Sequence, residues 1–156
     1  MRFLFVDQIL ELVPGERITA TKTMPSGEDV FRDHFPGFPV VPGVLLVEMM
    51  AQAGGKCLDA TKSRNGKAML GKIVSASFNQ WVRPDEKAVI HATIGSNRPE
   101  YATAKCFVEV NGRKVCSSEL FFVFAPRDQF SPEYVDEVLE RYLAKRQAGA
   151  PEEGNP

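Results

Sequence analysis

The segment Gly43–Ala60 constrains the fold more than any other part of the sequence. From Val44 to Ala53 it reads VLLVEMMAQA, in which Glu48 and Gln52 are the only polar residues. Pro42 stands just before this segment, a position where proline favours the start of a helix. A helix that is apolar almost all round belongs in a protein interior rather than on a surface. The rest of the chain must therefore cover this helix from several sides.

Strand-like runs flank the predicted helix on both sides in the sequence. Two of them, Arg2–Leu12 and Glu16–Met24, are rich in Ile, Val, Phe and Thr and are separated by Pro14-Gly15. Asn111-Gly112 is a strong hairpin signal because both residues accept positive φ. The short connections predict an antiparallel meander in the α+β class: a six-stranded antiparallel sheet wrapped around a central buried helix. The four later runs are Met69–Gln80, Lys87–Ile94, Tyr101–Val110 and Arg113–Phe124.

The carboxyl-terminal part predicts an additional helix. Ser131-Pro132-Glu133 has the pattern of an N-cap followed by proline at the first helical position. One apolar stripe follows at helical spacing: Val135, Val138, Leu139, Tyr142 and Leu143. We expect residues 1–126 to form the main domain, residues 127–147 an amphipathic helix packed on it, and residues 148–156 a flexible tail rich in Gly, Pro and Glu.

Composition excludes several classes of function. The chain has 156 residues, about one domain, with 44% hydrophobic and 25% charged residues and a net charge of −1. This balance predicts neither nucleic-acid binding nor attraction to an anionic membrane. Asp7 and Glu11 interrupt the stretch where a signal peptide would need an apolar core, so we expect a cytoplasmic protein. Three cysteines at spacings that fit no metal template predict buried thiols, with a cross-strand Cys106–Cys116 pair as the alternative.

Glu48 and Gln52 are four residues apart, so they lie on one face of the predicted helix. A buried carboxylate is unfavourable unless it is paired or hydrogen-bonded. One interpretation is a structural ion pair, and the other is an active-site acid. The preceding loop, residues 25–43, is long, shaped by Pro and Gly, and contains His34 in the segment HFPGFPVVPG. Loops of this length are commonly functional, which favours the second interpretation.

The segment HFPGFPVVPGVLLVEMMAQAGG, which begins at His34, closely resembles the signature of FabZ-type β-hydroxyacyl-[acyl carrier protein] dehydratases of the hotdog-fold superfamily. The matching elements are the histidine, two Pro-Gly pairs, and an acid fourteen residues after the histidine. The resemblance implies that His34 and Glu48 are the catalytic pair. It also implies that the Gly43 N–H binds the thioester carbonyl and that Gln52 supports the acid. FabA-type relatives carry aspartate at the acid position, so Glu48 favours dehydration without isomerisation.

The resemblance implies that the chain removes water from a (3R)-hydroxyacyl thioester on acyl carrier protein and forms the trans-2-enoyl thioester, in fatty-acid or related polyketide or polyene biosynthesis. A neutral histidine suits abstraction of the α-proton, and a protonated carboxyl can release the hydroxyl as water. No metal or organic cofactor is expected. In this family the active site is shared between two subunits of a homodimer, which in some members assembles further into a hexamer.

Several positions leave alternatives open. Candidate residues of the acyl tunnel, for which core packing is the alternative, are Val40, Val41, Val44, Leu45 and Phe78. Asp33 replaces the family's usual glycine before the histidine, and Pro84-Asp85-Glu86 replaces its usual Pro-Gly-Asp turn. Because of these departures, two alternative functions remain open: a hotdog acyl thioesterase and a catalytically impaired acyl-binding subunit. A basic stretch serves either carrier-protein docking or simple solvation: Lys56, Lys62, Arg64, Lys67 and Lys72.

Overall fold

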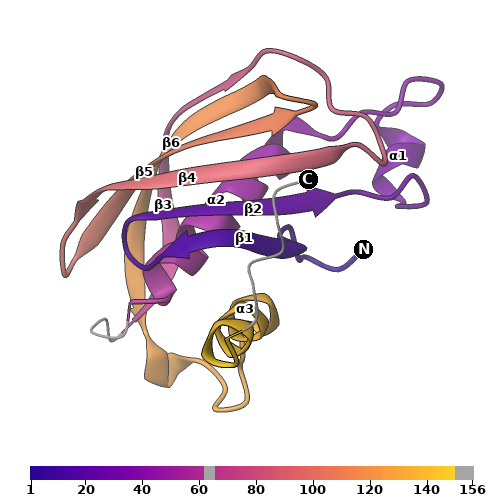
Figure 1. The fold of residues 1–156 in the computed structure, drawn as a ribbon. Helices are drawn as coiled ribbons and strands as arrows, with labels where there is room; N and C mark the ends of the chain where they lie inside the picture. Colours follow the sequence, from indigo (N-terminus) through magenta and orange to yellow (C-terminus); the bar gives the residue numbers. More distant parts are fainter. Residues whose placement is uncertain (62–65, 150–156) are drawn as a thin grey trace.

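The computed structural model describes residues 1–61 and 66–149. A six-stranded antiparallel sheet packs on the long helix α2 (Gly43–Asp59), which lies behind the sheet in Figure 1. This arrangement confirms the predicted fold class. The strands are β1 (Gln8–Val13), β2 (Arg17–Thr23), β3 (Gly66–Phe78), β4 (Lys87–Asn97), β5 (Tyr101–Val110) and β6 (Arg113–Pro126); the other helical elements are α1 (Val30–Asp33), η1 (Arg127–Gln129) and α3 (Glu137–Gln147).

The strand order is β1-β2-β4-β5-β6-β3. Two tight turns connect neighbouring strands where the sequence predicts them, with Gly15 at φ 72° between β1 and β2 and Asn111-Gly112 at φ 52° and 77° between β5 and β6. The strand β3 does not pair with β4, as a simple meander of the four later strands would require. It pairs with β6 instead and forms one edge of the sheet. The helix α2 and β3 thus intervene in sequence between β2 and β4, which are neighbours in the sheet.

The helix α2 is buried, as its composition predicts. Most of its side chains between Leu46 and Leu58 have little or no exposed surface and join one core with the inward-facing residues of the sheet. Glu48 and Gln52 are half-buried and lie on the side of the helix that faces a groove. Val44, at the first turn, is 74% exposed. The apolar composition therefore fixes the burial of the helix body but not of its amino-terminal end.

The edge strand β3 is apolar and exposed. From Met69 to Phe78 every residue of the strand is solvent-accessible in the single chain. An exposed edge with free backbone groups and large apolar side chains is a surface that another chain can cover. The large exposed side chains on this strand are Met69, Leu70, Ile73, Val74 and Phe78.

The carboxyl-terminal helix exists but begins later than predicted. Its N-cap is Asp136, whose carboxylate accepts a hydrogen bond from the backbone N–H of Leu139. Ser131 instead accepts a hydrogen bond from the N–H of Glu133 within a turn, so the predicted Ser131 cap is wrong. Both patterns offer a side-chain acceptor to a free N–H, and sequence alone does not rank them. The apolar stripe of α3 joins the core through Val138, Leu139 and Tyr142.

Two further differences concern the amino-terminal half. The first strand begins at Gln8 rather than at Arg2, and the residues before it run along α2. The long loop contains the short helix α1, which ends just before His34.

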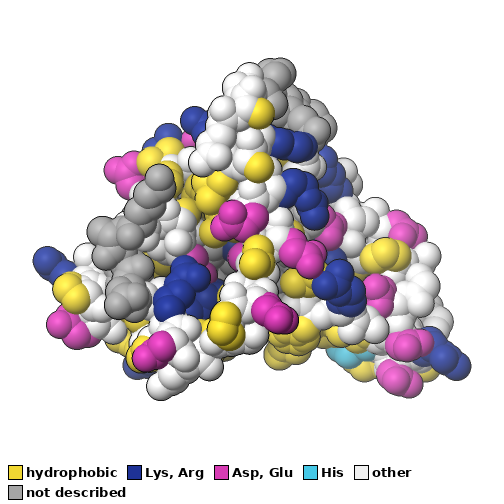
Figure 2. Space-filling view, turned by 90° about the horizontal axis from the view of Figure 1, so that it is seen from below, with side chains coloured by type: hydrophobic (Ala, Val, Ile, Leu, Met, Phe, Trp, Pro, Cys, Tyr) yellow, Lys and Arg dark blue, Asp and Glu magenta, His cyan; other side chains and the backbone are white. Residues whose placement is uncertain are grey.

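Seen from the side on which α3 lies, the surface carries interspersed acidic and basic side chains (Figure 2). Within residues 1–61 and 66–149, no helix is long and apolar enough to cross a membrane.

Candidate active site

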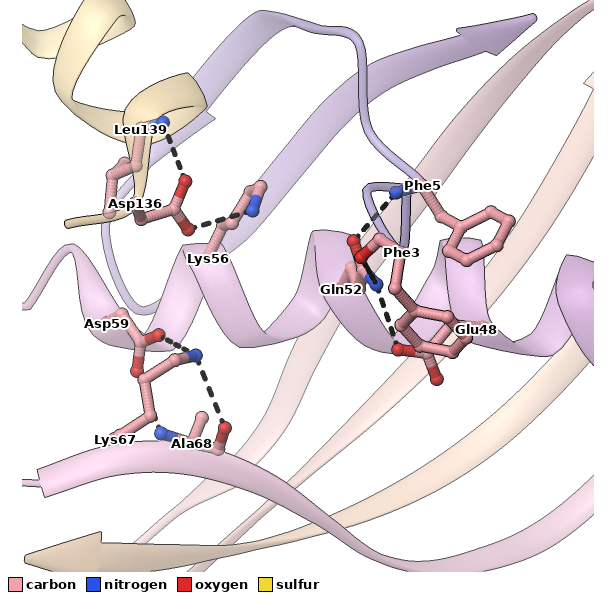
Figure 3. Close-up of polar contacts among 10 residues, drawn as sticks. All are labelled: Phe3, Phe5, Glu48, Gln52, Lys56, Asp59, Lys67, Ala68, Asp136 and Leu139. Carbon is pink, nitrogen blue, oxygen red and sulfur yellow. Dashed lines mark hydrogen bonds and ion pairs between the residues drawn. The ribbon is translucent and has the colours of Figure 1, made fainter. Parts of the chain in front are cut away.

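Glu48 lies in the second turn of α2, and its position is fixed by Gln52 one turn later. The Gln52 side-chain amide donates from Nε2 to Glu48 Oε1 at 2.9 Å (Figure 3). The same amide accepts from the backbone N–H of Phe5 at 2.8 Å and donates to the carbonyl of Phe3 at 3.2 Å. These three contacts determine which end of the amide faces the acid. Glu48 Oε1 is therefore a hydrogen-bond acceptor, and a proton on this carboxyl belongs on Oε2.

A groove of about 510 Å³ opens beside Glu48 between α2 and β3. The segment before β1 forms one side of it, and the segment before α3 forms another. Ten of its fifteen lining residues are apolar or aromatic, and the other five are Glu48, Gln52, Lys56, Lys67 and Asp136. The lining residues are Phe3, Leu4, Glu48, Ala51, Gln52, Gly55, Lys56, Lys67, Ala68, Met69, Leu70, Phe122, Tyr134, Val135 and Asp136.

Both lysines of the groove are held in ion pairs. Lys56 Nζ lies 2.8 Å from Asp136 Oδ2, and Lys67 Nζ lies 2.5 Å from Asp59 Oδ2 (Figure 3). Asp59 also accepts a hydrogen bond from the Ala68 N–H at 2.8 Å. These two lysines are thus engaged within the chain, which removes them from the basic stretch considered for carrier docking. Lys72 is exposed on β3, whereas Lys62 and Arg64 lie outside the described residues.

His34 forms the carboxyl-terminal cap residue of α1 and is half-buried. Its Nδ1 lies 3.1 Å from the carbonyl oxygen of Val40, and its ring stacks on Phe35 at 4.1 Å between centroids. A carbonyl only accepts, so Nδ1 carries the proton in this contact. In the neutral imidazole Nε2 then holds a lone pair, which is the arrangement of a general base. The peptide bond between His34 and Phe35 is cis.

Gly43 is the first residue of α2, where backbone N–H groups have no partner within the helix. The side chain of Phe78 packs against it so closely that a Cβ on Gly43 would lie 3.0 Å from Phe78 Cε1. Glycine therefore allows an aromatic ring to cover the helix start. The N–H groups and the helix dipole at this end favour a negatively charged oxygen.

The predicted tunnel residues occupy several different surroundings. Val40 and Val41 are buried, Val44 is exposed, and Leu45 packs on the core. None of the five predicted tunnel residues lines the groove beside Glu48, and neither does His34. The groove residues that sequence reasoning missed come from the chain's start, from α2, from β3, from β6 and from the segment before α3. No local pattern marks them, because they meet only through the fold.

Asp33, His91 and Trp81 lie outside the groove beside Glu48. Asp33 is exposed, which agrees with an orientation toward solvent. His91 lies between Glu109, at 2.7 Å from its Nε2, and Thr19, at 3.3 Å from its Nδ1. Trp81 is exposed and packs edge-on against Phe38.

The three cysteines are free and buried, as the first of the two sequence interpretations predicts. Burial raises the pKa of the Cys57 and Cys116 thiols to about 11 and that of Cys106 to about 12. These thiols are therefore protonated at neutral pH and are poor nucleophiles.

Several solved structures share this fold. The architecture is that of hotdog-fold proteins: it matches a hypothetical thioesterase with coenzyme A from Streptococcus pneumoniae at a TM-score of 0.62 and 11% identity, covering 76% of this chain and 85% of that one. It also matches the dehydratase heterocomplex ApeI:P from Xenorhabdus doucetiae at a TM-score of 0.56 and 14% identity, covering 72% and 92%. At these identities the likeness concerns the fold alone.

The chain belongs to the FabA-like family, whose domain model matches residues 1–119. Its sequence is 42% identical over 121 residues to the 3-hydroxyacyl-[acyl-carrier-protein] dehydratase FabZ of Lactobacillus helveticus, covering 77% of this chain and 82% of that protein. It is 39% identical over 122 residues to the protein of the same name from Enterococcus faecalis, covering 78% and 86%. The resemblance read from the His34–Gly55 segment is thereby confirmed at the level of the family.

Proposed function

We propose that this chain dehydrates a (3R)-3-hydroxyacyl thioester carried on acyl carrier protein and forms the trans-2-enoyl thioester. One observation carries the proposal: Gln52 holds Glu48 at an apolar groove with Oε2 free to carry a proton. This arrangement occurs in a chain whose relatives are named 3-hydroxyacyl-[acyl-carrier-protein] dehydratases. Fatty-acid biosynthesis is the setting that those names suggest, and the cytoplasm is the location that we expect.

The residues divide the reaction between a base and an acid. His34 Nε2 takes the α-proton of the substrate, and the electron pair released moves toward the thioester carbonyl. The Gly43 N–H, at the start of α2, stabilises the negative charge that develops on that oxygen. As the Cα=Cβ double bond forms, the Cβ–O bond breaks, and the proton from Glu48 Oε2 leaves with the hydroxyl as water. No step requires a metal or an organic cofactor.

A homodimer would bring the two halves of the site together. In one chain the groove beside Glu48 is not lined by His34, and the apolar edge strand β3 lies uncovered. Pairing of β3 with its copy would cover this edge and add backbone hydrogen bonds. We infer that His34 of one protomer then acts with Glu48 of its partner. Assembly of such dimers into a hexamer remains a prediction, as does the division into residues 1–126, 127–147 and 148–156.

A single assay distinguishes the proposed dehydratase function from its two alternatives, a thioesterase and an impaired acyl-binding subunit. Hydration of a trans-2-enoyl thioester, followed as loss of enoyl absorbance, is the dehydratase reaction run backwards. A thioesterase would release free thiol from the same substrate, and an impaired acyl-binding subunit would do neither. We expect hydration without thiol release. Thiol release without hydration, or inertness toward every acyl carrier protein substrate offered, would contradict the proposed function.

Two substitutions test whether His34 and Glu48 form the catalytic pair. His34→Ala and Glu48→Gln should each lower kcat/KM about 10²-fold or more while the protein stays folded. His91→Ala is the matched control, because His91 contacts Thr19 and Glu109 on the sheet and lies outside the groove. It should retain hydration activity. A near-wild-type rate for either His34→Ala or Glu48→Gln would remove that residue from the catalytic pair.

A further inference from the structure

The groove beside Glu48 is closed at one side by residues that lie beyond the family's domain. The family model ends at residue 119, whereas Tyr134, Val135 and Asp136 belong to the segment that leads into α3. This segment faces α2 and the beginning of β3 across the groove. The carboxyl-terminal extension of this chain therefore contributes a wall to the candidate substrate site rather than covering a remote surface.

A buried ion pair holds this wall against the helix that carries Glu48. The side chains of Lys56 and Asp136 are only 9% and 14% exposed and lie 2.8 Å apart. Asp136 uses its other oxygen, Oδ1, to cap α3 through the Leu139 N–H at 3.1 Å. One carboxylate thus fixes both the start of α3 and its distance from α2. Separating a buried ion pair would leave an uncompensated charge, so the Lys56–Asp136 pair holds this wall against α2.

The two residues before Asp136 present apolar surface that the chain's own core does not bury. Tyr134 is 46% and Val135 is 56% exposed, although both line the groove. Met69 and Leu70 on β3 are similarly exposed on the groove lining. On α2, Lys56 lies eight residues after Glu48, which corresponds to about 12 Å along the helix axis. An apolar chain that starts at Glu48 and runs along α2 meets this wall after that distance.

We propose that Tyr134 and Val135 form the end wall of the acyl site and limit the length of the acyl chain that the enzyme accepts. This inference rests on the proposed dehydratase function and adds a specificity-determining element to it. The occupant is the alkyl part of the thioester substrate, whose apolar surface matches the groove lining. Longer acyl chains are rejected because their terminal methylenes meet the wall that the Lys56–Asp136 pair anchors.

The test is a series of trans-2-enoyl thioesters on acyl carrier protein, from crotonyl through decenoyl to hexadecenoyl, hydrated by the full-length chain. Tyr134→Ala should raise kcat/KM for the longest substrate relative to crotonyl by about tenfold or more, the usual effect of space for extra methylenes. Val135→Trp should change the ratio in the opposite direction. Asp136→Asn, which retains a cap for α3 but loses its charge, should shift the ratio as Tyr134→Ala does, because the wall loosens.

Leu143→Ala is the control for a general weakening of α3, since Leu143 packs on the core from the same helix and does not line the groove. It should lower Tm and leave the chain-length ratio unchanged. A wild type that hydrates none of the substrates overturns the proposed function and this inference with it. If the wild type is active but the ratio of kcat/KM for the longest substrate to that for crotonyl is unchanged in both Tyr134→Ala and a folded Val135→Trp, the inference alone is overturned. In that case another surface, such as a second copy of the chain, closes the groove.

Discussion

Replacement of Gln52 by leucine should destabilise the fold and impair the acid at the same time. The amide of Gln52 makes three hydrogen bonds, to the Phe5 N–H, to the Phe3 carbonyl and to Glu48 Oε1. Leucine has a similar size and makes none of them. The substitution therefore separates the polar role of the side chain from its volume.

The three lost bonds differ in their effect on stability. Phe5 is 1% exposed, so its N–H finds no water, and an unsatisfied buried donor costs about 1–3 kcal/mol. Phe3 is 63% exposed, so its carbonyl regains a bond to water and contributes little. The bond to the half-buried Glu48 contributes about 0.5–1.5 kcal/mol. We expect a loss of about 2–4 kcal/mol in the free energy of unfolding, dominated by Phe5.

Urea unfolding of the wild type and the variant measures this loss, and hydration kinetics measure the effect on the acid. In the proposed mechanism the donor to Oε1 directs the proton of Glu48 to Oε2, so without this donor kcat should fall more than KM rises. Gln80→Leu is the matched control, because Gln80 is exposed and lies outside the Glu48 groove. A Gln52→Leu protein within about 0.5 kcal/mol of the wild type, the usual range for harmless surface changes, would refute the reasoning.

Three other outcomes are expected. Asp33→Gly should leave the acidic limb of the kcat/KM profile where it is, because Asp33 is exposed; a limb displaced to lower pH would show that its carboxylate acts on His34. Gly43→Ala should lower kcat with a smaller change in KM, since the new methyl displaces the Phe78 ring at 3.0 Å and disturbs the N–H that we propose to bind the developing oxyanion; unchanged kinetics would contradict that role. A disulfide-exchange reagent at pH 8 should label the native protein slowly and three thiols rapidly after unfolding. Rapid labelling of the native protein would contradict the burial of Cys57, Cys106 and Cys116. Burial also raises the pKa of these thiols from 9.0 to about 11 or 12. The free energy of unfolding should therefore fall as pH rises above 9, where only the thiols of the unfolded chain ionise.

Some features of this protein follow from short stretches of sequence. The apolar run in Gly43–Ala60 predicts a buried helix because its side chains point outward all round, so any side left in water would expose apolar surface. Asn111-Gly112 predicts a tight hairpin because the turn itself requires positive φ. The spacing of His34 and Glu48 in a distinctive segment is enough to identify the family. In each case the determining interaction lies within a few residues or in a pattern of fixed spacing.

Other features depend on contacts between distant residues, and only the tertiary structure decided them. Lys56 reads as a solvated charge in the sequence, yet it is buried because Asp136, eighty residues away, neutralises it. β3 pairs with β6 rather than with β4, and this pairing depends on contacts between segments far apart in the sequence, which no strand encodes locally. The groove beside Glu48 has walls from five separate segments, and its carboxyl-terminal wall, Tyr134 and Val135, directly precedes Asp136, which caps α3 in place of Ser131. The sequence by itself determined the family and predicted the catalytic residues, because both depend on residue types at fixed spacing. The tertiary structure alone decided the shape of the substrate site, because that shape is set by which distant surfaces pack together.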